Sequence, residues 1–296
     1  MAEQDGDGWS RCRQGHVHWG RFGAVGLLAY TADSAGGGSA AAPGDTRVLL
    51  VRRSRWGQHG GTWGPPGGAR DSDEPGLAAA LREAAEECGL PPGGVQVTGM
   101  LLDDHGGWSY RTYVAAADAL FGVRAASSEI TEAAWVAAGR VASLRLHPGF
   151  GERWPLLREA LAPVWLIVDA ANVMGARPDG WWRDRAAAAV RLHDQLSSFS
   201  ERGVAGLPDT LGLPGLDRWF PGVVLVVEGA AKAAAFDPAA RLTVVRAQGS
   251  GDDAIVAQAR SLPGRRLVVT ADRELRSRCV SAGASVTGPG WLLGLL

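Results

Sequence analysis

The sequence has few cysteines, and the three present (Cys12, Cys88 and Cys279) lie far apart without CxxC spacing. This spacing argues against a zinc site or a disulfide framework and fits a reducing compartment. An excess of basic charge is also missing, because 30 lysines and arginines stand against 31 aspartates and glutamates, for a formal net charge of -1. Sequence-independent binding of nucleic acid usually needs such an excess, so the composition does not imply this kind of binding.

Long hydrophobic runs are absent as well. No stretch reaches the roughly 18 apolar residues of a membrane-spanning helix. Residues 1–8 are acidic and glycine-rich, without the apolar core of a secretory signal. We therefore expect a cytoplasmic protein with no membrane partner. His16 and His18 are candidate ligands for a metal ion, although a mobile N-terminal tail is the expectation for this segment.

At 296 residues, with 46% hydrophobic and 21% charged residues, the sequence fits a globular protein of about two domains. We expect one domain over residues 15–162 and another over residues 163–296. Short apolar segments in the first part predict strands at residues 23–30, 48–53, 95–102 and 108–115.

After Pro163 the apolar runs become continuous, as strands buried on both faces require. They lie at residues 165–168, 223–227, 242–245 and 267–269. Helical patterns alternate with them at residues 183–199, 253–260 and 273–282. This alternation predicts a parallel sheet wrapped by helices.

The most specific motif runs from Gly68 to Leu90. It reads GARDSDEPGLAAALREAAEECGL and matches the pattern G-x5-E-x7-R-E-U-x-E-E-x-G-U, in which U is apolar, without a spacing error. In this segment the chain resembles the Nudix hydrolase family. The resemblance implies an α/β/α sandwich with a mixed sheet, and hydrolysis of a nucleoside diphosphate linked to another group X.

The residue types support this interpretation independently. Glu83, Glu86 and Glu87 stand at i, i+3 and i+4 of a helix, so their carboxylates are expected on one face. Like charges held together repel unless cations neutralise them, and hard oxygen ligands suit Mg²⁺ or Mn²⁺. The alternative is a solvated acidic helix face. The apolar stripe that packs this helix onto a sheet is expected to consist of Leu77, Leu81 and Ala84.

The resemblance also implies roles for neighbouring residues. The carbonyl of the residue matching Gly67 is often a metal ligand in the family, and Arg82 would orient the adjacent glutamates. A glutamate in a later loop serves some members as general base. Glu129 is the best counterpart here and Glu132 is its rival, with plain loop charge as the alternative for both.

The stretch WGQHGGTWGPPGG resembles the corresponding segment of Nudix members that hydrolyse damaged nucleoside triphosphates of the 8-oxo-dGTP type. Arg52, Trp63 and Tyr110 are the expected substrate-binding residues, since aromatic rings stack on bases. Trp56 and Trp108 are further stacking candidates, although packing is the commoner use of a tryptophan. Motifs of the NADH and coenzyme A pyrophosphatases are missing.

A second set of acids follows the predicted parallel strands, at the edge where ligands bind in open α/β sheets. The segments DAANVMG, VVEGAA, GSGDDAIV and VTADRELRSR resemble NYN domains of the PIN-like nuclease superfamily, especially the YacP type. The resemblance implies a Rossmannoid ribonuclease. Asp169, Asp252 and Asp272 would bind Mg²⁺ or Mn²⁺, with support from Asn172 and Asp253.

Simple helix capping is the alternative for Asp253 and Asp272. Arginines near these acids either touch RNA phosphates or form a solvated face. Three hypotheses follow: a Nudix hydrolase fused to a ribonuclease that acts on single-stranded or structured RNA; a Nudix hydrolase whose second domain is a non-catalytic RNA-binding or assembly module; and a nucleotide sensor that regulates the nuclease. The sequence does not fix the oligomeric state.

Overall fold

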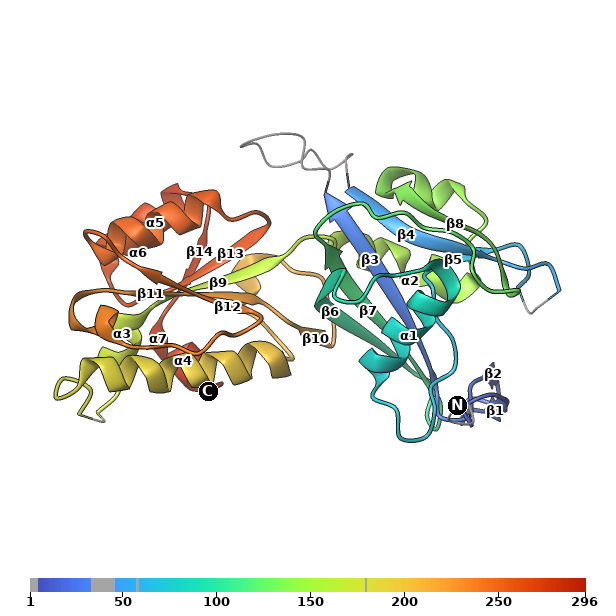
Figure 1. Ribbon diagram of the computed structural model, residues 1–296, viewed down its shortest axis with the longest axis horizontal. Helices are drawn as coiled ribbons and strands as arrows, with labels where there is room; N and C mark the ends of the chain where they lie inside the picture. The colour runs from blue at the N-terminus through green and yellow to red at the C-terminus, as the bar shows by residue number, and fades with distance from the viewer. Residues whose placement is uncertain (1–4, 33–45, 57–58, 179) are drawn as a thin grey trace. The chain divides into compact units, whose positions relative to one another are not determined.

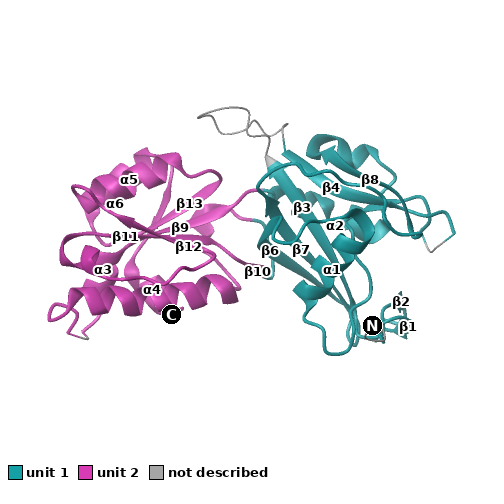
Figure 2. Ribbon diagram, in the orientation of Figure 1, with its two compact units in different colours: residues 1–161, 214–217 teal, residues 162–213, 218–296 magenta. Residues whose placement is uncertain are grey.

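The computed structural model describes residues 5–32, 46–56, 59–178 and 180–296. The chain divides into two compact units, which are coloured separately in Figure 2. Unit 1 comprises residues 1–161 and 214–217, and unit 2 comprises residues 162–213 and 218–296. Each unit has its own sheet and its own buried core.

The sheet of unit 1 is mixed, as predicted (Figure 1). Its strands follow the order β6-β7-β3-β4-β5, and β8 also pairs with β4. Strands β3 and β7 run parallel, whereas the other pairs are antiparallel. The elements of this unit are β1 (Trp9–Arg11), β2 (Val17–Trp19), β3 (Ala24–Ala32), β4 (Thr46–Arg53), β5 (Trp63–Gly64), α1 (Gly76–Cys88), β6 (Val95–Asp104), β7 (Ser109–Ala117), β8 (Ile130–Ala137), η1 (Ala138–Ser143) and α2 (Pro148–Glu159).

Helix α1 packs against β3 and β7 and carries the acidic motif. It begins after Pro75 and ends at Gly89, whose φ of 75° is left-handed and suits glycine at a helix C-terminus. The expected apolar stripe is only partly correct. Ala84 is buried, but Leu77 and Leu81 are half-buried. Small side chains carry the rest of the contact, because they let the helix approach the sheet closely; they are Ala79, Ala80 and Cys88.

Unit 2 confirms the predicted parallel sheet. Its strands follow the order β12-β11-β9-β13-β14, and every pair is parallel. Helices α5 and α6 lie on one side of this sheet, and α3, α4 and α7 lie on the other (Figure 1). The main elements are β9 (Val164–Asp169), α3 (Ala170–Gly175), α4 (Arg185–Arg202), β10 (Arg218–Trp219), β11 (Gly222–Val227), β12 (Leu242–Arg246), α5 (Gly251–Ser261), β13 (Arg265–Val269), α6 (Arg273–Ser281), β14 (Ser285–Thr287) and α7 (Pro289–Leu293), with short 3-10 turns η2 (Asp209–Leu211) and η3 (Gly229–Ala233).

The N-terminal segment departs from the expectation. Strands β1 and β2 pair as an antiparallel hairpin with Ser10 opposite His18, so His16 and His18 belong to a folded element. Within the part of the chain that the structure describes, no helix has the length and apolarity needed to cross a bilayer.

Candidate active site

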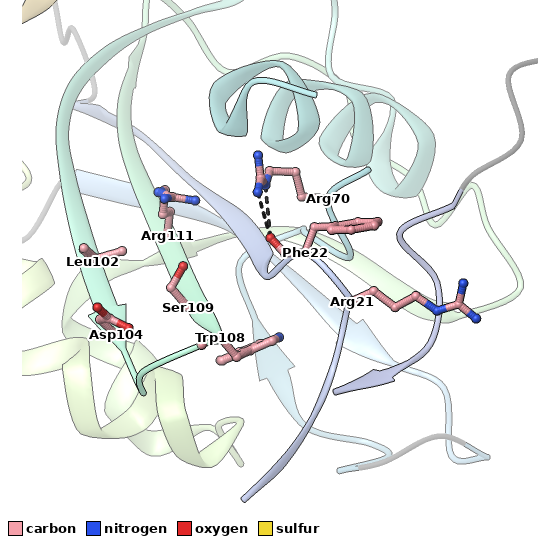
Figure 3. A pocket seen from close by; sticks show the side chains of 9 residues that line it. Arg21, Phe22, Arg70, Leu102, Asp104, Trp108, Ser109 and Arg111 are labelled. Atoms are coloured by element: carbon pink, nitrogen blue, oxygen red, sulfur yellow. Dashed lines mark hydrogen bonds between the residues drawn. The ribbon is translucent and has the colours of Figure 1, made fainter. Parts of the chain in front are cut away.

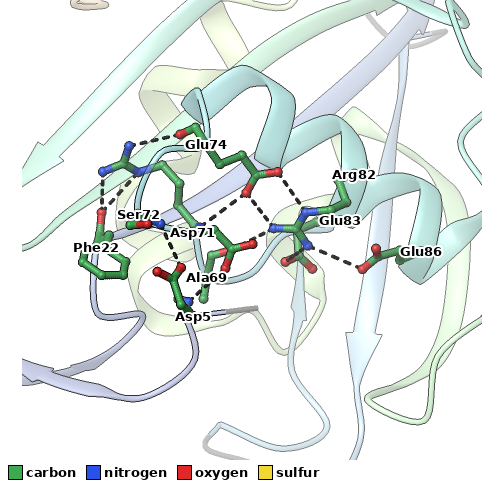
Figure 4. Close-up of polar contacts among 11 residues, drawn as sticks. Asp5, Phe22, Ala69, Asp71, Ser72, Glu74, Arg82, Glu83 and Glu86 are labelled. Atoms are coloured by element: carbon green, nitrogen blue, oxygen red, sulfur yellow. Dashed lines mark hydrogen bonds and ion pairs between the residues drawn. The ribbon is translucent and has the colours of Figure 1, made fainter. Parts of the chain in front are cut away.

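Arg82 is the centre of the polar contacts on α1 (Figure 4). Its Nε and Nη2 atoms each donate to the carboxylate of Glu74 at 2.9 Å, and Nη2 also donates to the Ala69 carbonyl at 3.2 Å. Its Nη1 atom lies 2.9 Å from Glu83 Oε1 and 3.5 Å from Glu86 Oε2. The Arg82 hydrogen bond also lowers the pKa of Glu74. Arg82 therefore fixes the loop before the helix and two acids of the motif.

Glu87 is the most buried acid of the motif, with 6% of its surface exposed. Its Oε2 atom accepts a hydrogen bond of 2.8 Å from the Gly67 N–H. Burial raises the pKa of Glu87 to about 8, against the effect of that N–H, and the nearby Glu83 carboxylate raises it further. Burial likewise raises the pKa of Glu83, against the effect of Arg82. Negative charge is thus costly at this pair.

Glu86 is placed differently from the other two glutamates. Its side chain is 52% exposed and turns toward Arg82. Glu83 and Glu87 therefore form the inner pair of the acidic cluster, and Glu86 lies at its exposed rim. For all three carboxylates to bind one ion, Glu86 has to leave Arg82.

Two glycines bring the loop before α1 against β3 and the acids. A Cβ on Gly67 would lie 2.1 Å from the Val25 carbonyl oxygen, and one on Gly68 would lie 2.7 Å from the Glu83 carboxyl carbon. N–H groups of β3 donate to the carbonyls of Pro66 and Gly68 at 2.9 Å. Because alternate carbonyls of an extended segment face opposite sides, the Gly67 carbonyl faces away from β3.

These donors fit a hard divalent cation. Carboxylates with raised pKa values favour a positive neighbour, and oxygen donors are the ligands that Mg²⁺ and Mn²⁺ prefer. Gly68 leaves the space beside the Glu83 carboxylate open. Any larger residue at position 68 would fill this space with its Cβ.

The two candidate bases are in different surroundings. Glu129 lies directly before β8, and its charge raises the pKa values of Glu83 and Glu87. Glu132 lies within β8, where its Oε2 atom is 3.8 Å from Arg52 Nη1. The strand spans Ile130–Ala137, so Glu129 belongs to the preceding loop and Glu132 does not. Of the two, Glu129 is the one coupled to the acidic cluster.

Arg53 is a residue that the sequence analysis did not select. Its positive charge lowers the pKa of Glu87, which places it near the cluster. Arg52 instead pairs with Glu132 and donates to the Gly61 carbonyl at 3.4 Å. Neighbouring residues of a strand face opposite sides, so the alternation along β4 was the signal for choosing between them.

The aromatic candidates are dispersed. The Tyr110 hydroxyl lies against Gly26, so close that a Cβ on Gly26 would be 2.2 Å from it. Burial and the charge of Glu87 raise the pKa of Tyr110. Trp63 is half-buried in β5. Trp56 is 97% exposed, and Trp108 donates from Nε1 to the Gly20 carbonyl at 2.9 Å. The charge of Glu87 acts on Tyr110, which places this ring near the acidic cluster.

A cavity of about 400 Å³ lies elsewhere on unit 1 (Figure 3). Three arginines, Arg21, Arg70 and Arg111, line it together with Phe22 and Trp108. Arg70 donates two hydrogen bonds to the Phe22 carbonyl, at 3.2 and 2.9 Å. None of the acidic motif residues lines this cavity.

In unit 2, Asp169 is the centre of the second acidic site. It is 5% exposed and caps α3, accepting from the Asn172 N–H at 3.0 Å and from Asn172 Nδ2 at 2.7 Å. The Thr270 hydroxyl, at the end of β13, donates to Asp169 Oδ2 at 2.9 Å. The Ala271 N–H donates to Asn172 Oδ1 at 3.3 Å. These hydrogen bonds join the carboxyl ends of the neighbouring strands β9 and β13.

Other acids surround this centre. Burial raises the pKa of Asp252, and the charges of Asp272, Asp169 and Glu228 raise it further. The four carboxylates are therefore neighbours at one end of the parallel sheet. Asp253 differs, because it forms an ion pair with Arg278.

Helix capping accounts for part of the second site. Asp272 Oδ1 accepts from the Leu275 N–H at 2.7 Å and caps α6. This contact is the alternative role that the sequence analysis left open. It uses one oxygen of the carboxylate, and the coupling of Asp272 to Asp252 shows that capping and membership of the acidic cluster coexist.

The comparisons with known proteins concern the first part of the chain. Residues 39–159 match the NUDIX domain model. The chain is 42% identical over 169 residues to the Mycobacterium tuberculosis protein named "Putative 8-oxo-dGTP diphosphatase 3", covering 54% of this chain and 72% of that protein. It is 36% identical over 156 residues to the nucleoside triphosphate pyrophosphatase/Nudix hydrolase fusion protein of Bifidobacterium longum, covering 52% of this chain and 31% of that protein.

A solved structure gives a similar match. The crystal structure of the M. smegmatis Nudix hydrolase RenU is 38% identical and covers 52% of this chain and 94% of that one, with a TM-score of 0.46. The sequence matches define the class of this chain, a hydrolase that acts on pyrophosphate bonds. The chain belongs to the Nudix hydrolase family.

Proposed function

We propose that unit 1 hydrolyses a damaged nucleoside triphosphate of the 8-oxo-dGTP type with the help of Mg²⁺ or Mn²⁺. The observation that carries this proposal is the pair formed by half-buried Glu83 and buried Glu87, held by Arg82 and the Gly67 N–H at a glycine loop. The identity to a relative named for 8-oxo-dGTP supports the substrate class.

Each residue has a distinct task in this proposal. Glu83, Glu86, Glu87 and the Gly67 carbonyl would hold the divalent ion. The bound ion offsets the charge of the phosphate oxygens and lowers the pKa of a water molecule. Arg82 keeps the acids in place. Glu129 is the general base, because it lies beside the cluster and, among the described residues, no ion pair holds it as Arg52 holds Glu132.

Substrate contacts are assigned on the same basis. Tyr110 lies beside the acids, and Trp63 and Arg52 lie on the paired strands β5 and β4. Arg53 is added to this set because its charge reaches Glu87. A cation in this position suits the phosphate chain of a nucleotide.

A substrate panel tests the proposal. Full-length protein with Mg²⁺ is incubated with 8-oxo-dGTP, dGTP, ADP-ribose and dinucleoside polyphosphates, and the products are separated. We expect the highest kcat/KM on 8-oxo-dGTP, with release of pyrophosphate and the nucleoside monophosphate. A preference for ADP-ribose would overturn the substrate assignment and leave the family unchanged.

We also propose that unit 2 is an NYN-type, metal-dependent ribonuclease. The observation that favours it is the coupling of Asp252 to Asp169 and Asp272 at the carboxyl edge of the parallel sheet. Asp169, Asp252 and Asp272 would hold Mg²⁺ or Mn²⁺, supported by Asn172 and Asp253. Carboxylates gathered in this way suit phosphodiester cleavage.

Labelled single-stranded and structured RNA distinguish this proposal from its alternatives. The ribonuclease proposal predicts cleavage by the full-length chain with Mg²⁺ in the absence of nucleotide. Binding without cleavage would identify unit 2 as an RNA-binding module. Cleavage that depends on an unhydrolysed nucleotide would identify unit 1 as a sensor that regulates the nuclease.

A further inference from the structure

Four potential metal ligands converge in unit 1, apart from both acidic sites. They are Cys12, His16, His18 and His105, and one ligand atom from each lies within 4.8 Å of all the others. Three of them come from the β1–β2 hairpin, and His105 comes from the turn between β6 and β7. The group therefore joins two segments that are distant in the sequence.

Two histidine nitrogens of this group, one from His18 and one from His105, are buried without a hydrogen bond to any described residue. They are His18 Nε2 and His105 Nδ1. A buried polar atom without a partner costs free energy. Two such atoms beside a buried thiol are satisfied together by one cation that accepts their lone pairs. The Cys12 thiol is also buried, with 4% of the residue exposed.

A carboxylate supports the outer side of the His105 ring. His105 Nε2 lies 3.4 Å from Asp103 Oδ1, and Arg153 Nη2 donates to the same oxygen at 3.1 Å. A metal-binding histidine commonly uses its second nitrogen in this way, which fixes the ring and leaves the other nitrogen for the metal. His105 Nδ1 is the nitrogen left over here.

The backbone holds the ligands in place. The Cys12 N–H donates to the His16 carbonyl at 3.0 Å, and the Arg13 N–H donates to the Gly106 carbonyl at 2.8 Å. The His18 ring stacks on Trp108, with centroids 4.0 Å apart and planes at 9°. A two-stranded hairpin alone is at best marginally stable in water, and a shared ion would add to these contacts in holding this one against the β6–β7 turn.

We propose that Cys12, His16, His18 and His105 bind one Zn²⁺ ion as a closed structural site. One sulfur and three nitrogen ligands suit zinc, and four protein ligands leave no open position for catalysis. Tetrahedral zinc separates its ligand atoms by roughly 3.3–3.8 Å, so small side-chain movements from the observed spacing complete the site. The spacing of the three cysteines argued against a zinc site in the sequence analysis, but that argument concerns sites built from several cysteines, and only Cys12 takes part here.

Zinc content and cobalt substitution test this site in the full-length chain. The protein is loaded with ZnCl₂ or CoCl₂, dialysed, and measured by mass spectrometry and by visible absorption. We expect about one Zn²⁺ per chain, and a cobalt spectrum with a thiolate charge-transfer band and tetrahedral ligand-field bands. Cys12→Ser should remove the charge-transfer band, and His105→Gln should lower the zinc content to less than a tenth of that of the unaltered chain.

The control is His59→Gln, because His59 is an exposed histidine outside the group. It should keep both the zinc and the cobalt spectrum. Asp103→Asn tests the positioning of His105 and should weaken zinc about 10- to 100-fold in competition with a chelator. Equal zinc content in the unaltered chain and in Cys12→Ser, or a cobalt spectrum without the thiolate band, would overturn the proposal.

Discussion

Glu87 Oε2 and the Gly67 N–H are joined by a hydrogen bond of 2.8 Å, although the glutamate is almost completely buried. The bond ties the last turn of the acidic helix to the loop that precedes the helix. Because the carboxyl group has lost its water, one N–H does not compensate for burial, and the pKa of Glu87 rises to about 8. The protein thus keeps an acid where its charge is unfavourable until a cation arrives.

A pH dependence of metal stabilisation follows. In the metal-free protein, the raised pKa of Glu87 stabilises the fold at low pH, and this contribution is lost as the pH rises from 4.5 to about 8. Metal binding requires the deprotonated form, so Mg²⁺ affinity should increase over the same window. We expect a larger Mg²⁺-induced rise in Tm at pH 8 than at pH 6. Glu87→Gln should abolish this difference, and an equal rise at both values in the unaltered protein would contradict the assignment.

Gly68 should not tolerate a methyl group. The Cβ of Gly68→Ala would meet the Glu83 carboxyl carbon at 2.7 Å. A displacement of about 1 Å in a catalytic group costs roughly 100-fold in rate, so we expect a loss of that order in kcat. Gly139→Ala is the matched control, since its Cβ meets nothing within 4 Å. Similar kinetics for the two variants would disprove the steric argument.

Arg82 should be irreplaceable by lysine. An ammonium group cannot make the paired contacts of Arg82 with Glu74 while also reaching Glu83. Arg82→Lys should therefore lower activity by about 10- to 100-fold, as is usual for a residue that supports metal ligands. Steady-state kinetics at saturating Mg²⁺ measure the loss. Arg158→Lys, at an exposed position on α2, should leave activity unchanged. A fully active Arg82→Lys would show that Arg82 is not needed to hold the acids in place.

The second site predicts a separation of activities. Asp169→Asn should remove RNA cleavage and spare nucleotide hydrolysis, since the two acidic groups lie in different units. Asp184→Asn provides the control, because Asp184 also caps a helix, accepting from the Ala187 N–H at 2.9 Å. If capping alone mattered, both variants would behave alike. Survival of RNA cleavage in Asp169→Asn would show that the site is misassigned.

Continuous motifs were predictable from the sequence. The acidic motif occupies one helix and its preceding loop, so spacing alone placed Glu83 and Glu87 on a common face. The buried parallel strands of unit 2 were equally predictable, because continuous apolar runs are typical of strands covered on both sides. The order of these strands in the sheet then brought Asp169 and Asp272 to one edge.

Contacts between distant segments were not predictable. His105 meets Cys12 only because the β6–β7 turn folds against the N-terminal hairpin, and no local pattern records that contact. Glu86 is 52% exposed and lies 3.5 Å from Arg82, a placement that the helical spacing alone did not reveal. Burial of small alanines in place of Leu77 and Leu81 reflects how closely α1 approaches β3.

The most direct test of the central claim is the turnover of 8-oxo-dGTP by Glu87→Gln, measured with Mg²⁺ beside the unaltered chain. Glutamine retains the shape of the side chain and its hydrogen bond from Gly67, but it removes the charge. The loss of several kcal/mol of transition-state stabilisation corresponds to roughly a 10²- to 10⁴-fold lower kcat, with an unchanged circular dichroism spectrum. Near-normal turnover in this variant would contradict the account.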